Sequence, residues 1–231
     1  MQMKTIGLLG GMTWHSTIEY YRLFNEFVYQ KLGEQNSAKV LLYSFNFDDL
    51  RKWQTTDTFV LAEQLAKAAL KLEKAGADVI LIGANTMHEY YPQVQNTVSV
   101  PVLHIADAVG KKIVTNNIKK VLLLGTKYTM QGNFYKSKLA EYGIETTVPD
   151  LGEQKIINDV IYNELTFGEI KSSSRNAYLK IIESIKQKEH VEGLILGCTE
   201  IPLLIKQNHT DLKVFDTTEI HALRAVEFVI K

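Results

Sequence analysis

A pattern that occurs twice constrains the fold of this chain more than any other feature. An apolar run that ends in glycine occupies residues 4–11, and a matching run occupies residues 119–126. In each half, helical segments and a further short apolar run follow, with Thr86 after the run of the first half and Cys198 after that of the second. From Gly10 to Thr86 is 76 residues, and from Gly125 to Cys198 is 73. The repetition predicts two similar α/β lobes.

The short apolar runs indicate the content of each lobe. A run such as residues 193–196 is too short for a core helix and is bounded by glycines, so it predicts a buried parallel strand. From residue 57 to a C-cap at Gly76, apolar positions fall on one face of a helix. Residues 48–54 predict a loop or a short helix. We therefore expect an α/β fold with two pseudo-symmetric Rossmann-like lobes, each a mainly parallel sheet flanked by helices, and an active-site cleft between them.

Matched intervals also predict the domain limits. From Thr86 to His104 is 18 residues, as from Cys198 to Asp216, and both intervals end in an apolar strand. We expect residues 1–103 to form the first lobe, residues 104–211 to form the second, and residues 212–231 to return to the first. Because no Gly/Ser-rich linker separates the halves, we expect them to pack closely.

Composition excludes several classes of protein. The 26 basic residues balance 26 acidic residues, and no basic stripe is interleaved with aromatics, which argues against a nucleic-acid partner. One cysteine excludes an internal disulfide framework and a CxxC metal site, and it predicts a reducing, cytoplasmic location. The apolar run at residues 6–12 is short and broken by glycine, so we expect neither a signal peptide nor a membrane span. The six histidines lack the spacing of a metal site.

Two features point to a ligand site. Cys198 follows a buried strand, at the sheet edge where open α/β folds bind ligands, and its thiol is either a small buried apolar group or a reactive one. Gly10 and Gly11 follow the first strand and allow a carboxylate or phosphate to approach backbone N–H groups. The GxGxxG pattern of a dinucleotide site is missing. Pseudo-twofold symmetry would bring Thr86 and Cys198 face to face.

Four segments resemble the aspartate/glutamate racemases, which are similar to glutamate and hydantoin racemases. They are residues 10–22 with Gly-Gly-Met-Thr-Trp, residues 85–88, residues 104–107, and residues 197–201 with Gly-Cys-Thr-Glu-Ile. The resemblance spans nearly the whole chain. It implies a cofactor-independent isomerase that racemises acidic amino acids with two opposed acid/base residues, and frequent dimerisation. Most such enzymes have cysteine at both positions, and relatives that pair Thr with Cys favour the L-enantiomer.

The repeat and the resemblance together predict the site residues. The Cys198 thiolate is expected to remove the α-proton, with Thr86 donating or relaying a proton to the opposite face. A thiol has a pKa of about 8.5 that a helix N-terminus or nearby donors can lower, whereas the threonine hydroxyl is far less acidic. His88 and His104 lie close in sequence to the predicted cleft, and Glu200 either orients the thiol or caps the next helix. The predicted substrate-binding residues are Met12, Arg51, Gln54, Asn85, Thr199 and Glu200.

Other functions stay open at this point. Relatives with a single cysteine include decarboxylases and cis/trans isomerases of dicarboxylates. A binding protein for acidic amino acids with little turnover is the second alternative. A cysteine hydrolase is disfavoured because no suitable His/Asn partner accompanies Cys198. Aspartate and glutamate both remain candidate substrates, and the expected partners are a small-molecule substrate and a second copy of the chain, with no nucleic acid and no membrane.

Overall fold

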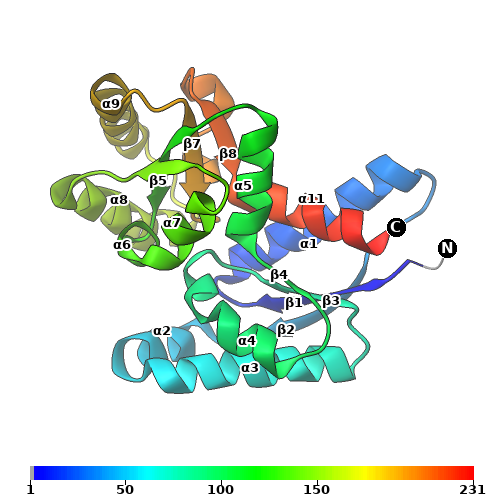
Figure 1. The fold of residues 1–231 in the computed structure, drawn as a ribbon. Coiled ribbons are helices and arrows are strands. Elements are labelled where there is room, and N and C mark those ends of the chain that lie inside the picture. Colours follow the sequence, from blue (N-terminus) through cyan, green and yellow to red (C-terminus); the bar gives the residue numbers. More distant parts are fainter. Residues whose placement is uncertain (1–2) are drawn as a thin grey trace. The chain divides into compact units, whose positions relative to one another are not determined.

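The computed structural model describes residues 3–231, which form two compact units. The first unit runs to Ile105 and resumes at Thr218, and the second is Ala106–Thr217. Each unit is a four-stranded parallel sheet flanked by helices (Figure 1), so the predicted α/β fold with two lobes is confirmed. The return to the first unit comes later than residue 212 because residues 213–216 form a strand of the second sheet.

The sheet of the first unit has the strand order β2-β1-β3-β4, and every neighbouring pair is parallel. Its strands are β1 (Thr5–Gly10), β2 (Lys39–Ser44), β3 (Val79–Ile82) and β4 (Val102–Leu103). Residues 48–54 lie in a helix, whose N-cap side chain, Asn46, accepts a hydrogen bond from the N–H of Asp48. The helices that follow these strands are α1 (Trp14–Leu32), α2 (Phe47–Thr56), α3 (Thr58–Lys74), the 3-10 helix η1 (Thr86–Tyr90) and α4 (Tyr91–Thr97).

The second unit repeats this topology strand for strand, with the parallel order β6-β5-β7-β8. Its strands are β5 (Lys120–Gly125), β6 (Glu145–Thr147), β7 (Gly193–Gly197) and β8 (Lys213–Asp216). The sequence repeat is therefore a structural duplication. The intervening helices are α6 (Lys127–Gln131), α7 (Asn133–Ala140), α8 (Leu151–Asn163), η2 (Leu165–Phe167), α9 (Ser172–Glu189), α10 (Ile201–Leu204) and η3 (Gln207–His209).

Strand register corrects the alignment of the two halves. β1 and β5 have the same length and burial pattern, so Gly10 corresponds to Gly125. β3 pairs with β1 as β7 pairs with β5. On this register the counterpart of Cys198 is Ala84, whereas the matched sequence intervals had paired Cys198 with Thr86. The equivalent pairs are Leu9 and Leu124, Ile82 and Leu196, Gly83 and Gly197, and Ala84 and Cys198.

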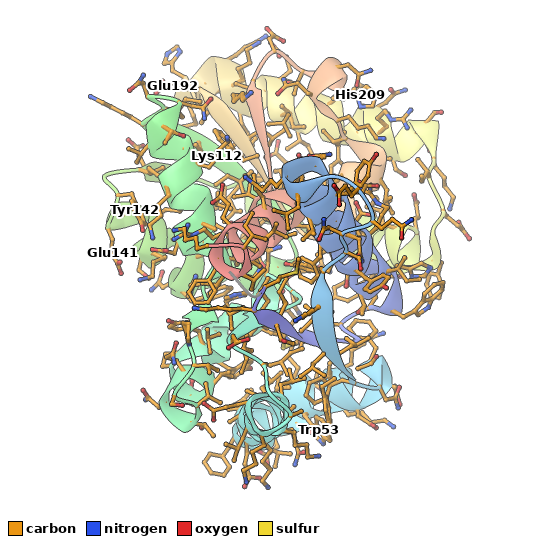
Figure 2. All side chains as sticks on the ribbon, turned by 90° about the vertical axis from the view of Figure 1, so that its right-hand side faces the viewer. Trp53, Lys112, Glu141, Tyr142, Glu192 and His209 are labelled. Atoms are coloured by element: carbon orange, nitrogen blue, oxygen red, sulfur yellow. The ribbon has the colours of Figure 1, made fainter. Side chains whose placement is uncertain are left out.

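The last helix after each sheet belongs to the other unit. α5 (Ile105–Thr115) follows β4 but lies in the second unit from Ala106 on, where Asp107 accepts a hydrogen bond from Tyr142, labelled in Figure 2. α11 (Thr217–Val229) follows β8 but lies in the first unit from Thr218 on. Its buried residues share an apolar cluster with the β1 side chains Ile6 and Leu8. Burial of this apolar face ties the C-terminal helix to the first sheet.

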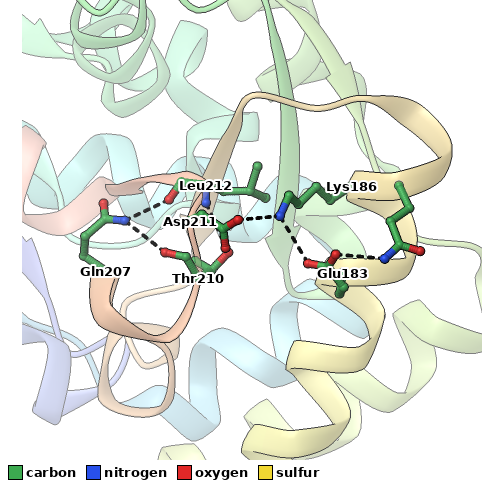
Figure 3. Close-up of polar contacts among 7 residues, drawn as sticks. Glu183, Lys186, Gln207, Thr210, Asp211 and Leu212 are labelled. Atoms are coloured by element: carbon green, nitrogen blue, oxygen red, sulfur yellow. Dashed lines mark hydrogen bonds and ion pairs between the residues drawn. The ribbon is translucent and has the colours of Figure 1, made fainter.

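Polar contacts fix the connection between β7 and β8 (Figure 3). Lys186 of α9 contacts Asp211 at 2.7 Å and Glu183 at 3.4 Å. The amide of Gln207 donates to the carbonyl oxygen of Leu212 at 2.9 Å. These contacts hold the start of β8 beside α9, at the edge of the sheet opposite to the one that carries Cys198.

We also searched the helices of residues 3–231 for membrane segments. None of them combines the length and the apolar composition that crossing a bilayer requires.

Candidate active site

The predicted site residues lie beyond the carboxyl ends of the strands. In the first unit, Met12 follows β1, α2 follows β2, and Thr86 follows β3. In the second unit, Cys198 follows β7. All strands in each sheet are parallel, so these segments gather along one edge of their own sheet, where open α/β sheets bind ligands.

The glycine turn after β1 is shaped by a close backbone contact. Gly11 has a φ of +77°, and a Cβ built there would lie 2.1 Å from the carbonyl oxygen of Phe45, so only glycine fits. The Gly11 N–H donates to Thr17 Oγ1 at 2.8 Å, and the Thr13 N–H donates to Ser16 Oγ at 3.3 Å. The expectation that N–H groups of this turn await an anion is therefore wrong for these two donors. The sequence did not predict that side chains of α1 accept hydrogen bonds from both of these N–H groups.

Met12 and the α2 residues differ in exposure. Met12 is buried in the apolar cluster of the first unit, which fits a packing role. Arg51 is exposed. Gln54 is half-buried, and its Nε2 atom is enclosed with no hydrogen-bond partner in residues 3–231. An enclosed amide donor without a partner is costly unless a ligand or water satisfies it, so Gln54 is the better ligand-binding candidate on this helix. The preceding residue, Trp53, labelled in Figure 2, packs against the apolar cluster of the first unit.

The segment after β3 is held by a buried histidine. His88 Nδ1 donates to the carbonyl oxygen of Ala84 at 2.8 Å, and His88 Nε2 accepts from the N–H of Ile105 at 3.1 Å. Burial lowers the pKa of His88 to about 4, so the ring is neutral at physiological pH. Asn85 is buried and Thr86 is half-buried at the start of η1. His88 therefore positions the backbone of this segment.

A second buried histidine lies beside the first. His221 contacts the Tyr20 hydroxyl through Nδ1 at 2.9 Å and the Leu103 carbonyl oxygen through Nε2 at 2.9 Å. Burial, and then the neighbouring His88, lower the pKa of His221 to about 3. The His104 ring is 4.8 Å from that of His88. The sequence placed His88 and His104 near the site, but it did not reveal the contribution of α11 to this cluster.

The thiol of Cys198 contacts a carboxylate. Cys198 Sγ donates to Glu200 Oε2 at 3.0 Å, and Thr199 Oγ1 donates to the same oxygen at 2.7 Å. Cys198 and Glu200 are buried, with 8% and 4% of their surfaces exposed. The structure thus brings together three of the predicted residues. It also decides between the two roles considered for Glu200, since this side chain binds the thiol and makes no side-chain cap bond to α10.

The pKa of the Cys198 thiol is raised well above its usual range. Burial is the largest cause, followed by the charge of Glu200 and its hydrogen bond to the thiol. The backbone N–H groups of Glu200 and Thr199 act in the opposite direction but do not prevail. A helix N-terminus or nearby donors can lower the pKa of a thiol, but here burial and then the adjacent carboxylate outweigh the backbone donors. The resting group is therefore a thiol, and Glu200 is placed to accept its proton.

One candidate residue was missed. Thr126 comes directly after Gly125, which pairs with Gly197, so Thr126 and Cys198 leave neighbouring strands at the same level. It is buried, and its hydroxyl accepts a hydrogen bond from the N–H of Thr129. The signal was present in the sequence, because Thr126 ends the repeated apolar run.

Within the part of the chain that the structure describes, no group of three or more His, Cys, Asp or Glu residues is arranged to hold a metal ion.

Comparison with known proteins defines the class. The sequence pattern of the Asp/Glu/hydantoin racemase family matches residues 9–225, which is nearly the whole chain. The chain therefore belongs to the Asp/Glu/hydantoin racemase family, and it is an amino-acid racemase.

Individual relatives support this membership. The chain is 27% identical over 225 residues to the broad specificity amino-acid racemase RacX of Bacillus subtilis, covering 92% of both chains. It is 42% identical to a Yersinia pestis protein whose structure carries a provisional Asp/Glu racemase assignment, with a TM-score of 0.93 and coverage of 99% and 100%. It is 39% identical to an aspartate racemase homologue from Pyrococcus horikoshii, with a TM-score of 0.88 and the same coverage.

Proposed function

We propose that this racemase acts on aspartate, glutamate or both, without a cofactor, and that Cys198 transfers the α-proton. The observation that carries the proposal is the contact of 3.0 Å between Cys198 Sγ and Glu200 Oε2 at the end of β7. A buried thiol with an adjacent proton acceptor is a suitable acid/base pair. The names of the relatives, which include an aspartate racemase homologue and a glutamate racemase from Aquifex pyrophilus, suggest the acidic substrates.

The proposed reaction has two proton transfers at this pair. Glu200 first takes the thiol proton, which leaves a thiolate stabilised by the backbone N–H groups of Thr199 and Glu200. The thiolate then takes the α-proton of the bound amino acid, and the electron pair of the broken C–H bond is delocalised into the α-carboxylate. Reprotonation of the same carbon from the opposite face gives the other enantiomer.

Substrate binding is assigned to polar groups at the sheet edges. We propose that the amide of Gln54 binds a substrate carboxylate, because its Nε2 atom is an enclosed donor without a partner. Asn85, Thr86 and Arg51 are proposed as further contacts to the amino acid. Thr86 is proposed as a hydrogen-bonding residue and not as an acid/base, because its hydroxyl is weakly acidic and it lies two residues beyond Ala84, the counterpart of Cys198.

Three further expectations remain proposals. We propose a kinetic preference for the L-enantiomer, by the resemblance to relatives with one thiol, and a homodimeric state that light scattering can measure. A cytoplasmic location is proposed from the single cysteine.

The test is proton exchange in deuterated water with each enantiomer of aspartate and glutamate, followed by NMR and chiral chromatography. Cys198→Ala should abolish exchange and racemisation, since it removes the proposed base. Cys198→Ser is the matched control, because serine has a side chain of similar size whose hydroxyl is a far weaker acid than the thiol. Exchange at the wild-type rate in Cys198→Ala would exclude the assignment.

A second candidate function, decarboxylation or isomerisation of a dicarboxylate, is favoured by Ala84, the counterpart of Cys198. Ala84 carries no acid/base group, and single-thiol relatives include decarboxylases and isomerases of dicarboxylates. Product analysis with malonates and maleate distinguishes this candidate from racemisation. A binding protein would instead show thermal stabilisation by acidic amino acids with no deuterium incorporation.

A further inference from the structure

The position equivalent to Cys198 in the first unit is held by an alanine. Strand register places Ala84 directly after Gly83, the residue that follows β3, as Cys198 directly follows Gly197, the last residue of β7. Thr86 lies two residues further on and corresponds to Glu200. The two halves therefore differ in chemistry at the same place in the duplicated fold.

Backbone contacts support this alignment independently. A Cβ built on Gly83 would lie 2.8 Å from the carbonyl oxygen of Leu9. A Cβ built on Gly197 would lie 2.8 Å from the carbonyl oxygen of Leu124. Leu9 and Leu124 are equivalent in the duplication, so both glycines meet the same feature of the neighbouring strand. The residues that follow them, Ala84 and Cys198, thus occupy matched positions.

The downstream elements support it as well. β4 pairs with β3 through Leu103 and Leu81, as β8 pairs with β7 through Phe215 and Ile195. With this alignment α5 and α11 begin at equivalent residues. Ala84 to Leu103 is 19 residues and Cys198 to Phe215 is 17, so the connection is two residues longer in the first unit. This difference of two residues explains why counting intervals selected Thr86.

The two positions have different capacities for proton transfer. At Cys198 a thiol donates to a carboxylate at 3.0 Å, which forms a complete acid/base pair. The methyl group of Ala84 cannot accept or donate a proton. Thr86 is the counterpart of Glu200, the hydrogen-bond partner of the thiol. It is not the counterpart of Cys198. A racemase needs a proton donor for each face of the α-carbon, and this chain has one thiol position filled.

We propose, on the basis of the proposed function, that Cys198 is the single side-chain acid/base of this enzyme and that Ala84 leaves protonation of the other face to water. Cys198 then removes the α-proton of one enantiomer, and its thiol exchanges that proton with solvent. Return of a deuteron from Cys198 to the same carbanion face restores the starting enantiomer with label. Inversion requires a deuteron from heavy water at the other face, and the deuteroxide left behind takes the proton held on Glu200, which restores the resting carboxylate and thiol. Exchange with retention therefore exceeds inversion.

The experiment compares exchange and inversion for each enantiomer of aspartate and glutamate in deuterated water. A positioned acid/base contributes roughly 10²- to 10⁴-fold, so exchange with retention in the wild type should exceed inversion by about 10²-fold or more for one enantiomer. Ala84→Cys should raise inversion by up to about 10²-fold, because it supplies the second thiol. Thr86→Cys should raise inversion less than Ala84→Cys does, because its thiol stands two residues beyond the counterpart of Cys198. The size-matched control Ala84→Ser should leave inversion within about threefold of the wild type, because a hydroxyl is far less acidic than a thiol.

The possible results distinguish a failure of this inference from a failure of the proposed function. Equal rates of exchange and inversion in the wild type, or a gain from Thr86→Cys that exceeds the gain from Ala84→Cys, would overturn this inference while leaving Cys198 as the base. No exchange with any enantiomer would overturn the proposed function and this inference with it. The wild-type ratio needs no variant, so the inference stays falsifiable even if a substituted chain does not fold.

Discussion

Replacement of Glu200 by glutamine should make Cys198 more reactive toward electrophiles while it slows proton transfer to substrate. The carboxylate contacts the sulfur at 3.0 Å, and both its charge and its hydrogen bond raise the thiol pKa. Glutamine has nearly the same shape but no charge. Glu200→Gln should therefore lower the pKa of the thiol and increase the thiolate fraction at neutral pH.

The size of the effect follows from Coulomb's law. Two unit charges about 4 Å apart interact by about 1 kcal/mol in water and about 4 kcal/mol at an effective dielectric constant of about 20. The thiolate fraction should then rise by about 5-fold to about 10³-fold, because about 1.4 kcal/mol is a factor of ten. A less basic thiolate is also less nucleophilic, with a Brønsted coefficient of about 0.4–0.5, which reduces the expected gain in alkylation to about 2-fold to 50-fold.

Alkylation with iodoacetamide, followed by intact-mass spectrometry between about pH 6 and 9, measures this directly. Cys198 is the only cysteine in the chain, so each added mass reports one site, and Cys198→Ala is the blank. Only 8% of the Cys198 surface is exposed, which slows alkylation in the wild type and in Glu200→Gln alike. The ratio of the two alkylation rates therefore reports ionisation of the thiol. The wild-type rate should rise with pH because its thiol pKa is raised, and the variant's curve should lie at lower pH.

Deuterium exchange on the same two proteins completes the test. It should fall by about 10²-fold in Glu200→Gln, because the acceptor of the thiol proton is gone. Alkylation that slows or stays unchanged in the variant would refute the electrostatic reasoning, and undiminished exchange would refute the role of Glu200 as proton acceptor.

Three further outcomes are expected. Gly11→Ala should lower the free energy of unfolding by at least about 1–2 kcal/mol in denaturant titrations, because a Cβ at φ +77° would also meet the Phe45 carbonyl; unchanged stability would contradict the close contact. Between pH 7 and 5 the free energy of unfolding should fall by about 3–4 kcal/mol, because His88 and His221 take up protons there only in the unfolded state; His88→Asn should reduce this pH dependence, and an unchanged slope would contradict the low pKa of His88. Racemisation should survive exhaustive dialysis against a chelator, and loss that added metal restores would contradict cofactor independence.

Much of the fold was predictable because glycine-bounded apolar runs and amphipathic helices recur in both halves. The strands ending at Gly10 and Gly197 lie where the sequence placed them, and so does the helix that begins after Asp57. The assignment of α5 to the second unit and of α11 to the first was expected from the matched intervals of the two halves and not from the helices themselves. A helix that follows a strand in sequence carries no mark of which sheet its apolar face will cover, because both sheets offer similar surfaces.

The chemistry of the site was predictable only in part. The sequence identified Cys198 and its neighbours Thr199 and Glu200, but it could not give the state of the thiol. That state depends on whether the adjacent carboxylate turns toward the sulfur, which is a matter of rotamer and burial. Counting residues also paired Thr86 with Cys198, because connection lengths vary more readily than hydrogen-bonded strand register.

The two halves differ at the first residue beyond the glycines that end the central strand connections, and backbone contacts explain why the difference begins there. Gly83 and Gly197 are held by the same contact, since a side chain at either position would meet a carbonyl oxygen of the neighbouring strand. No such constraint acts on the next residue, where Ala84 and Cys198 differ. The duplicated sheet thus fixes the backbone up to the glycine and leaves the first residue beyond it open to chemical change. A methyl in place of a thiol at that position removes a group that can transfer a proton without altering the fold, which is why the fold alone does not specify the chemistry.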